Sequence, residues 1–118
     1  MREITTHKVN GLNEALTINV IDDPGQGNAC HVYDILGCNP NNVTIRFQNG
    51  PIKEAGVNGI SKEALLAIVR DRLEGFQSGP YACKTNAHAL VCVIGAMTAL
   101  HSRTKERTER GVEGTHTV

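Results

Sequence analysis

The 118-residue sequence predicts an α+β protein, in which a small N-terminal antiparallel β-sheet is followed by a two-helix hairpin. In residues 1–60, clusters of Gly and Asn recur at short intervals and separate β-rich runs, which is typical of short strands joined by turns. In residues 61–118, apolar residues recur at helical spacing instead. We therefore expect a β-rich part, 1–60, and a helical hairpin, 61–118, within one compact unit rather than two independent domains.

Three runs in the first part predict strands. Residues 16–20 and 43–47 alternate apolar with polar side chains, and residues 32–36 form a similar run. A period of two with one polar face indicates a sheet that is covered on one side only.

The first helix is expected to begin after Ser61, a good N-cap, with Glu63 favourable in the first turn. Gly75 and the 78–80 segment, Ser-Gly-Pro, end it. One apolar stripe repeats at three and four residues along this helix: Leu65, Leu66, Val69, Leu73 and Phe76.

A second helix is expected over residues 82–110, and its first half is apolar nearly all round. Such a helix must be buried on several sides, which one small sheet and one partner helix do not supply. The sequence therefore predicts a homo-oligomer with this helix at the interface. The alternative is that the sheet and the first helix cover it within one chain.

The composition argues against several classes of function. Twelve basic residues balance twelve acidic ones, whereas binding to nucleic-acid polymers needs surplus positive charge. No secretory signal is visible, and the apolar run over 87–100 is too short and interrupted to span a membrane, so we expect a cytoplasmic protein.

The sequence predicts neither a catalytic constellation nor a metal site. No GxSxG, HExxH, Walker or GxGxxG motif is present. The four cysteines form no CxxC pair and the histidines show no ligand spacing, so the cysteines are interpreted as reduced thiols, mostly buried.

Three features could hold a ligand, and each has a plainer interpretation. Arg103, Arg107 and Arg110 share one face of the second helix, either as an anion site or as a solvated end with intrahelical ion pairs. Phe76 is either core or a platform on which a base stacks, with Asn86 offering an amide to the base edge. The Gly-rich segment 25–28 is either a tight turn or part of a phosphate loop.

Two segments of the second part, FQSGPYACKTN over 76–86 and RTKERTERGVEGT over 103–115, resemble a phage helical-hairpin family. This family contains the Thoeris anti-defence sponge and the anti-CBASS sponge. Segments 7–13 and 23–29 are similar to the Thoeris sponge as well. The resemblance thus extends over nearly the whole chain.

The resemblance implies a binding protein without cofactor or catalytic residue, acting in the cytoplasm of an infected bacterium. Its partners would be cyclic nucleotide signals, namely glyco-cyclic ADP-ribose isomers made by TIR enzymes and, in a separate pocket, cyclic trinucleotides of the CBASS type. The assembly implied is a homohexamer built from helical hairpins. An enzyme that degrades the signal and a small nucleic-acid-binding phage protein are the alternatives.

The same resemblance implies the site residues. In the cyclic ADP-ribose pocket, Phe76 would stack on the base, Asn86 would make a polar contact, and Arg103 would pack on the ligand. The turn that contains Gly27 and Asn28 would close this pocket near the phosphates. In the cyclic trinucleotide pocket, the candidates are Arg107, Arg110 and Thr115.

Overall fold

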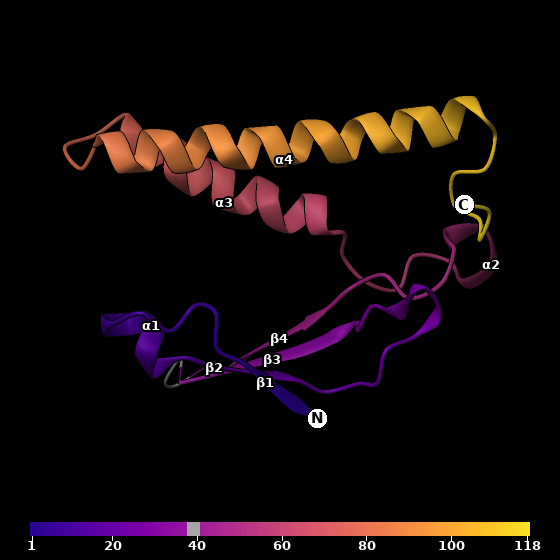
Figure 1. Cartoon of the computed structure of the whole chain (residues 1–118), viewed down its shortest axis with the longest axis horizontal. Helices are drawn as coiled ribbons and strands as arrows, with labels where there is room; N and C mark the ends of the chain where they lie inside the picture. The colour runs from indigo at the N-terminus through magenta and orange to yellow at the C-terminus, as the bar shows by residue number, and fades with distance from the viewer. Residues whose placement is uncertain (38–40) are drawn as a thin grey trace. The chain divides into compact units, whose positions relative to one another are not determined.

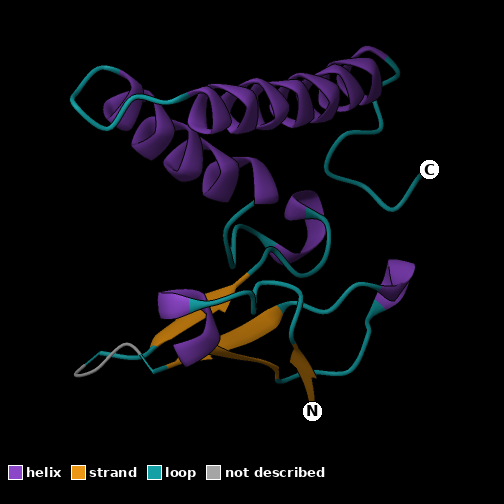
Figure 2. Ribbon diagram, turned by 60° about the vertical axis from the view of Figure 1, so that its left-hand side comes forward, coloured by secondary structure: helices purple, strands orange, loops and turns teal. Residues whose placement is uncertain are grey.

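The computed structural model describes residues 1–37 and 41–118, so Cys38 lies outside the described residues. The chain divides into two units. Residues 1–50 and 57–60 form the sheet unit, and residues 51–56 and 61–118 form the helical unit. The antiparallel sheet and the C-terminal helical hairpin predicted from the sequence are both present (Figures 1 and 2).

The sheet unit contains four strands in the order β1-β2-β3-β4, with every neighbouring pair antiparallel. Strands β2, β3 and β4 coincide with the three predicted runs, whereas β1 and two short helical segments carried no clear sequence signal. Helix α1 begins at Gly11, within one of the Gly and Asn clusters that indicate turns between strands. The bounds are β1 Arg2–Ile4, α1 Gly11–Ala15, β2 Thr17–Val20, η1 Gln26–Asn28, β3 Val32–Leu36 and β4 Val43–Arg46.

The strand register gives the sheet one mainly polar and one mainly apolar face. The exceptions are Val32 and Leu36, which share the polar face with Asp34, and Arg2, which pairs with Val20 on the apolar face. Because directly paired residues lie on the same face, Glu3, Asn19, Asp34 and Thr44 line one face, where the Thr44 hydroxyl donates to Asp34 at 2.8 Å. The opposite face carries the apolar residues Ile4, Ile18, Val20, Tyr33, Ile35, Val43 and Ile45.

The core of the sheet unit is small. Val20 is 1% exposed and Cys30 is also buried. The rings of Tyr33 and Phe47 meet edge to face at 5.6 Å between centroids, and Phe47 pairs with Ile60 through a backbone bridge. Residues 57–60 thereby belong to the sheet unit.

The helical unit consists of α2, Ile52–Ala55, α3, Lys62–Gln77, and α4, Lys84–Glu109. The predicted cap of α3 is confirmed, because Ser61 Oγ accepts a hydrogen bond from the Ala64 N–H at 3.0 Å. Helix α4 begins two residues later than expected, since Cys83 adopts an extended conformation and caps it.

Helix α4 extends well past α3. At 1.5 Å per residue, the 26 residues of α4 span about 39 Å and the 16 residues of α3 about 24 Å. Much of its apolar surface is exposed in one chain: Val91 is 66% exposed, and Met97 is the buried apolar residue among those described in this unit. The predicted oligomer, which would cover this surface, stays a prediction. None of the described helices is long and apolar enough to cross a membrane.

The chain after α4 turns back toward α2. Gly111 and Gly114 both have a positive φ, near +75°, which a residue with a side chain adopts only with strain. The Gly114 carbonyl accepts a hydrogen bond from the Lys53 N–H at 3.4 Å, and His116 Nε2 lies 3.3 Å from a carboxylate oxygen of Glu54. This return explains why residues 51–56 group with the hairpin.

Candidate functional site

Phe76 lies in the last turn of α3 and is 38% exposed, so it does not complete a buried stripe. Its ring meets the ring of Tyr81, which belongs to the helix connection, at 6.4 Å between centroids and an angle of 61°. The guanidinium carbon of Arg72, one turn earlier on α3, lies 5.5 Å from the Phe76 centroid. An exposed aromatic ring with an adjacent cation is therefore present at the connected end of the hairpin.

Asn86 lies in the first turn of α4, at the same end of the hairpin. Its backbone N–H donates to Cys83 Sγ at 3.4 Å, and the Cys83 N–H donates to the Gln77 side-chain carbonyl at 3.0 Å. These two bonds tie the start of α4 to the end of α3. Within the described chain, the half-buried amide of Asn86 itself makes no hydrogen bond, so both its donor and its acceptor are available.

Arg103 is distant from these residues in a single chain. It follows Asn86 by seventeen positions on the same continuous helix, which places it about 25 Å further along the axis. Its side chain is exposed and has no ion pair among the described residues. One chain therefore does not bring Arg103 together with Phe76 and Asn86 around a single small ligand.

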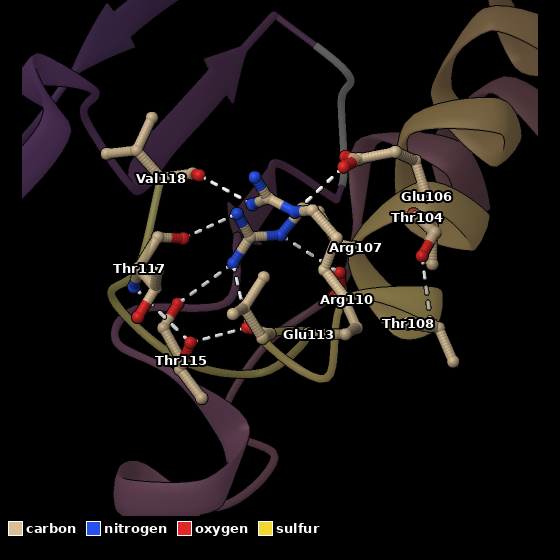
Figure 3. Close-up of polar contacts among 10 residues, drawn as sticks. Thr104, Glu106, Arg107, Thr108, Arg110, Glu113, Thr115, Thr117 and Val118 are labelled. Atoms are coloured by element: carbon tan, nitrogen blue, oxygen red, sulfur yellow. Dashed lines mark hydrogen bonds and ion pairs between the residues drawn. The ribbon is translucent and has the colours of Figure 1, made fainter.

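Arg107 is buried, with 6% of its surface exposed, and its guanidinium is surrounded by the C-terminal segment (Figure 3). Nε donates to a carboxylate oxygen of Glu113 at 3.1 Å, and Nη1 donates to the Thr117 carbonyl at 2.6 Å. Nη2 donates to the carbonyls of Val112 and Thr115, at 3.0 and 3.2 Å. Arg107 thus holds residues 112–117 in one folded tail.

Arg110 remains more exposed and has fewer contacts. Its Nε lies 2.7 Å from a carboxylate oxygen of Glu106, one turn earlier, and its Nη2 donates to the Val118 carbonyl at 2.6 Å. The intrahelical ion pair considered for this helix end is therefore present at Arg110. Thr115, the third candidate of this group, donates its hydroxyl to the Val112 carbonyl within the same tail.

Gly27 and Asn28 occupy a tight turn of the sheet unit. Both have a positive φ, +83° and +68°, and the turn is closed by hydrogen bonds from the Gly25 N–H to the Ala29 carbonyl and from the Asn28 N–H to the Gly25 carbonyl. A pocket of about 230 Å³ in this unit is not lined by either residue. Its lining is Met1, Arg2, Asp22, Asp23, Pro24 and Cys30.

Asp22 holds the strand that follows this turn. Its carboxylate accepts hydrogen bonds from the backbone N–H groups of His31, at 2.9 and 3.1 Å, and of Val32, at 3.0 Å. Partial burial raises the pKa of Asp22, but these N–H donors and the nearby His31 ring outweigh it and hold the pKa below its usual value. The turn is therefore anchored by an ionised carboxylate.

Two side-chain contacts on the helices were not predicted from the sequence, although each joins residues at the i, i+4 spacing that indicates contact on a helix. One is Arg72 with Phe76. The other is His88 with Cys92, whose Nε2 and Sγ atoms lie 3.7 Å apart. Across residues 1–37 and 41–118, no group of three or more His, Cys, Asp or Glu side chains converges as a metal site would require.

The chain matches a known protein family. The profile of the Acb2/Tad1 hairpin domain matches residues 39–102, more than half of the chain. The chain belongs to the Acb2/Tad1 hairpin family. The resemblance inferred from the sequence is thereby confirmed. The chain is also 47% identical over 74 residues to Thoeris anti-defense 1 of Bacillus phage SBSphiJ7, a match that covers 63% of this chain and 52% of the relative. It thus spans about half of that protein's length.

Some of the candidate site residues lie within the matched region, and others lie outside it. Phe76 and Asn86 lie within residues 39–102, on the two helix ends that meet at the hairpin connection. Arg103 directly follows the matched region, and the tail around Arg107 lies beyond it. In the sheet unit, the turn at Gly27 precedes it.

Proposed function

We propose that this member of the Acb2/Tad1 hairpin family is a phage anti-defence protein that binds and sequesters a cyclic nucleotide signal without cleaving it. The ligand we propose is a glyco-cyclic ADP-ribose isomer. The anti-defence role rests on the similarity to the relative from Bacillus phage SBSphiJ7, which is named for its action against the Thoeris system. The ligand class rests on the chemistry of the hairpin end.

The observation that carries the proposal is that Phe76 and Asn86 lie at the same end of the hairpin, in the last turn of α3 and the first turn of α4. An exposed aromatic ring in a protein with few aromatic residues offers a face on which a base stacks. An amide without hydrogen-bond partners in the described chain offers a donor and an acceptor for the edge of an adenine. Both lie in the region that defines the family.

We further propose that the complete pocket is formed by more than one copy of the chain. Arg103 lies about 25 Å from Asn86 along α4, so an Arg103 that packs on the same ligand must come from a second copy. The exposed apolar surface of α4, with Val91 at 66%, supports such an assembly, because burying it is favourable. A hexamer is the state that we propose.

A second pocket, for cyclic trinucleotides, is proposed at the tail. In this pocket Arg110 would contact the phosphates, since its guanidinium is partly exposed and is paired mainly within its own helix. Arg107 would act by holding the tail, because its own donors are already engaged with Glu113 and three carbonyls. Thr115 would act as part of that folded tail.

The test is a retention experiment on the full chain. The protein is incubated with glyco-cyclic ADP-ribose or, separately, with a cyclic trinucleotide, then filtered, heated and analysed by mass spectrometry. Sequestration predicts that intact ligand stays with the protein and is released on denaturation. Ligand that passes through the filter, or emerges cleaved, contradicts the proposal and favours a different partner or a degrading enzyme.

Two variants test the site itself. Base stacking on an aromatic ring contributes about 1–3 kcal/mol, so Phe76→Ala should weaken retention by roughly fivefold to a hundredfold. Asn86→Ala should weaken it as well, because a base edge loses its hydrogen bonds. Thr85→Ala, at the exposed neighbour of Asn86, is the matched control and should retain the ligand. Full retention in both Phe76→Ala and Asn86→Ala would remove the site assignment, and size-exclusion chromatography should show an unchanged assembly for every variant.

A further inference from the structure

Arg72 places a cation beside the proposed stacking surface. It lies one helical turn before Phe76 on α3, and its guanidinium carbon is 5.5 Å from the centroid of that ring. This is a cation–π contact, which is weak at an exposed site because water competes for the charge. Arg72 is itself exposed, so its guanidinium is free to exchange this contact for a stronger one.

The charge of Arg72 has no carboxylate partner within the described residues. The contrast is with Arg70 on the same helix, whose Nε lies 3.5 Å from a carboxylate oxygen of Glu74 in an i, i+4 pair. An uncompensated guanidinium beside an aromatic ring differs from an ordinary solvated helix charge, since its planar fork is suited to bind phosphate with two hydrogen bonds. The hairpin end therefore combines a stacking ring, a free amide at Asn86 and an unpaired cation.

We propose that Arg72 is a ligand-binding residue of this site, whose guanidinium binds a phosphate of the nucleotide that stacks on Phe76. This inference rests on the proposed function and extends it. A base that takes a face of Phe76 competes with or sandwiches the guanidinium, so Arg72 lies next to the ligand in either arrangement. The site then selects a phosphate-bearing nucleotide over the corresponding nucleoside.

The size of the effect follows from charge-assisted hydrogen bonding. A hydrogen bond to a charged group is lost together with its Coulomb attraction when the guanidinium is replaced by a neutral amide. Because the site is partly exposed, solvent screens that attraction, and we expect roughly a tenfold loss of affinity in Arg72→Gln. The salt dependence of binding should fall as well, since one phosphate contact fewer is made.

The experiment measures the affinity of the full chain for glyco-cyclic ADP-ribose at two salt concentrations, with adenosine as a phosphate-free competitor. Arg72→Gln should bind the cyclic nucleotide about tenfold more weakly and with less salt dependence, while competition by adenosine is unchanged. Arg72→Lys, which keeps the charge, should recover part of the affinity. Arg70→Gln is the matched control, because its arginine is engaged with Glu74, and it should bind as the wild type does.

The outcomes separate this inference from the function on which it rests. If Phe76→Ala loses the ligand while Arg72→Gln binds as the wild type does, the stacking site stands and the role of Arg72 is wrong. If Arg72→Gln binds more weakly with unchanged salt dependence, or binds adenosine equally poorly, Arg72 only supports the Phe76 ring and the inference is overturned. If the wild-type chain retains no cyclic nucleotide, both the function and the inference fall.

Discussion

Replacing Arg107 with methionine should release the C-terminal tail while leaving the helical hairpin folded. Arg107→Met keeps an unbranched apolar stem and removes the guanidinium that donates to Glu113, Val112, Thr115 and Thr117. The carbonyl partners regain hydrogen bonds to water once the tail detaches. The free energy of tail docking that is lost is therefore smaller than the sum of four separate hydrogen bonds.

The expected magnitude follows from the burial of the site. Hydrogen bonds to a charged group contribute about 1.5–3 kcal/mol each, and breaking a buried ion pair costs about 3–5 kcal/mol. Glu113 is 39% exposed, so solvent screens its attraction to Arg107 and weakens the ion pair. We therefore expect Arg107→Met to reduce the stabilisation of the docked tail by about 3 kcal/mol. Since 1.36 kcal/mol corresponds to a factor of ten, the protection of tail amides against hydrogen exchange should fall by up to about a hundredfold.

Hydrogen exchange read by mass spectrometry measures this directly. Peptides that contain the Thr115 N–H, which donates to the Val112 carbonyl at 3.1 Å, should exchange faster in Arg107→Met, while peptides from α3 should not change. The matched control is Arg103→Met, because Arg103 is an exposed arginine of the same helix without an ion pair in the described chain. Equal exchange in the tail of the wild type and of Arg107→Met, or an equal effect of Arg103→Met, would refute the anchoring role.

Two further predictions concern single groups. Arg110→Ala should weaken retention of a cyclic trinucleotide and spare glyco-cyclic ADP-ribose, and an equal loss of both ligands in the filtration assay would indicate one pocket rather than two. Asp22→Asn should lower the free energy of unfolding in urea at neutral pH, because its carboxylate accepts N–H bonds from His31 and Val32. Because the folded pKa of Asp22 lies below its unfolded value, its stabilisation is complete above the unfolded pKa, near 3.9, and is lost as pH falls through the folded pKa. The difference from wild type should therefore shrink in acid, and a difference that persists there would contradict an ionised anchor.

Local patterns account for the elements that the sequence predicted correctly. The alternation in β2 and β4 and the cap at Ser61 depend on neighbours a few residues apart, so they can be read along the chain. Strand β1 and helix α2 could not be predicted from such local patterns. Strand β1 has three residues, and its pairing with β2 defines it, while α2 is a single turn that contacts a tail more than fifty residues away.

The candidate site also contains features that local sequence predicts and features that it does not. The exposed ring of Phe76 and the amide of Asn86 lie where the capping and turn signals at the hairpin connection predict helix ends. The contact of Arg72 with Phe76 could also have been found, because an i, i+4 pair on a helix is a local feature. The spacing of Arg103, Arg107 and Arg110 was visible too, but it did not distinguish their very different surroundings.

The sequence by itself determined strands β2, β3 and β4, the two long helices and the residue types at the hairpin end, because hydrophobic period, caps and turn residues act over a few positions. Only the tertiary structure decided that Arg107 is buried within a returning tail while Arg103 remains exposed. Two arginines one helical turn apart have the same local signal. Their burial, and hence their charge environment, depends on where a segment beyond Gly111 folds back.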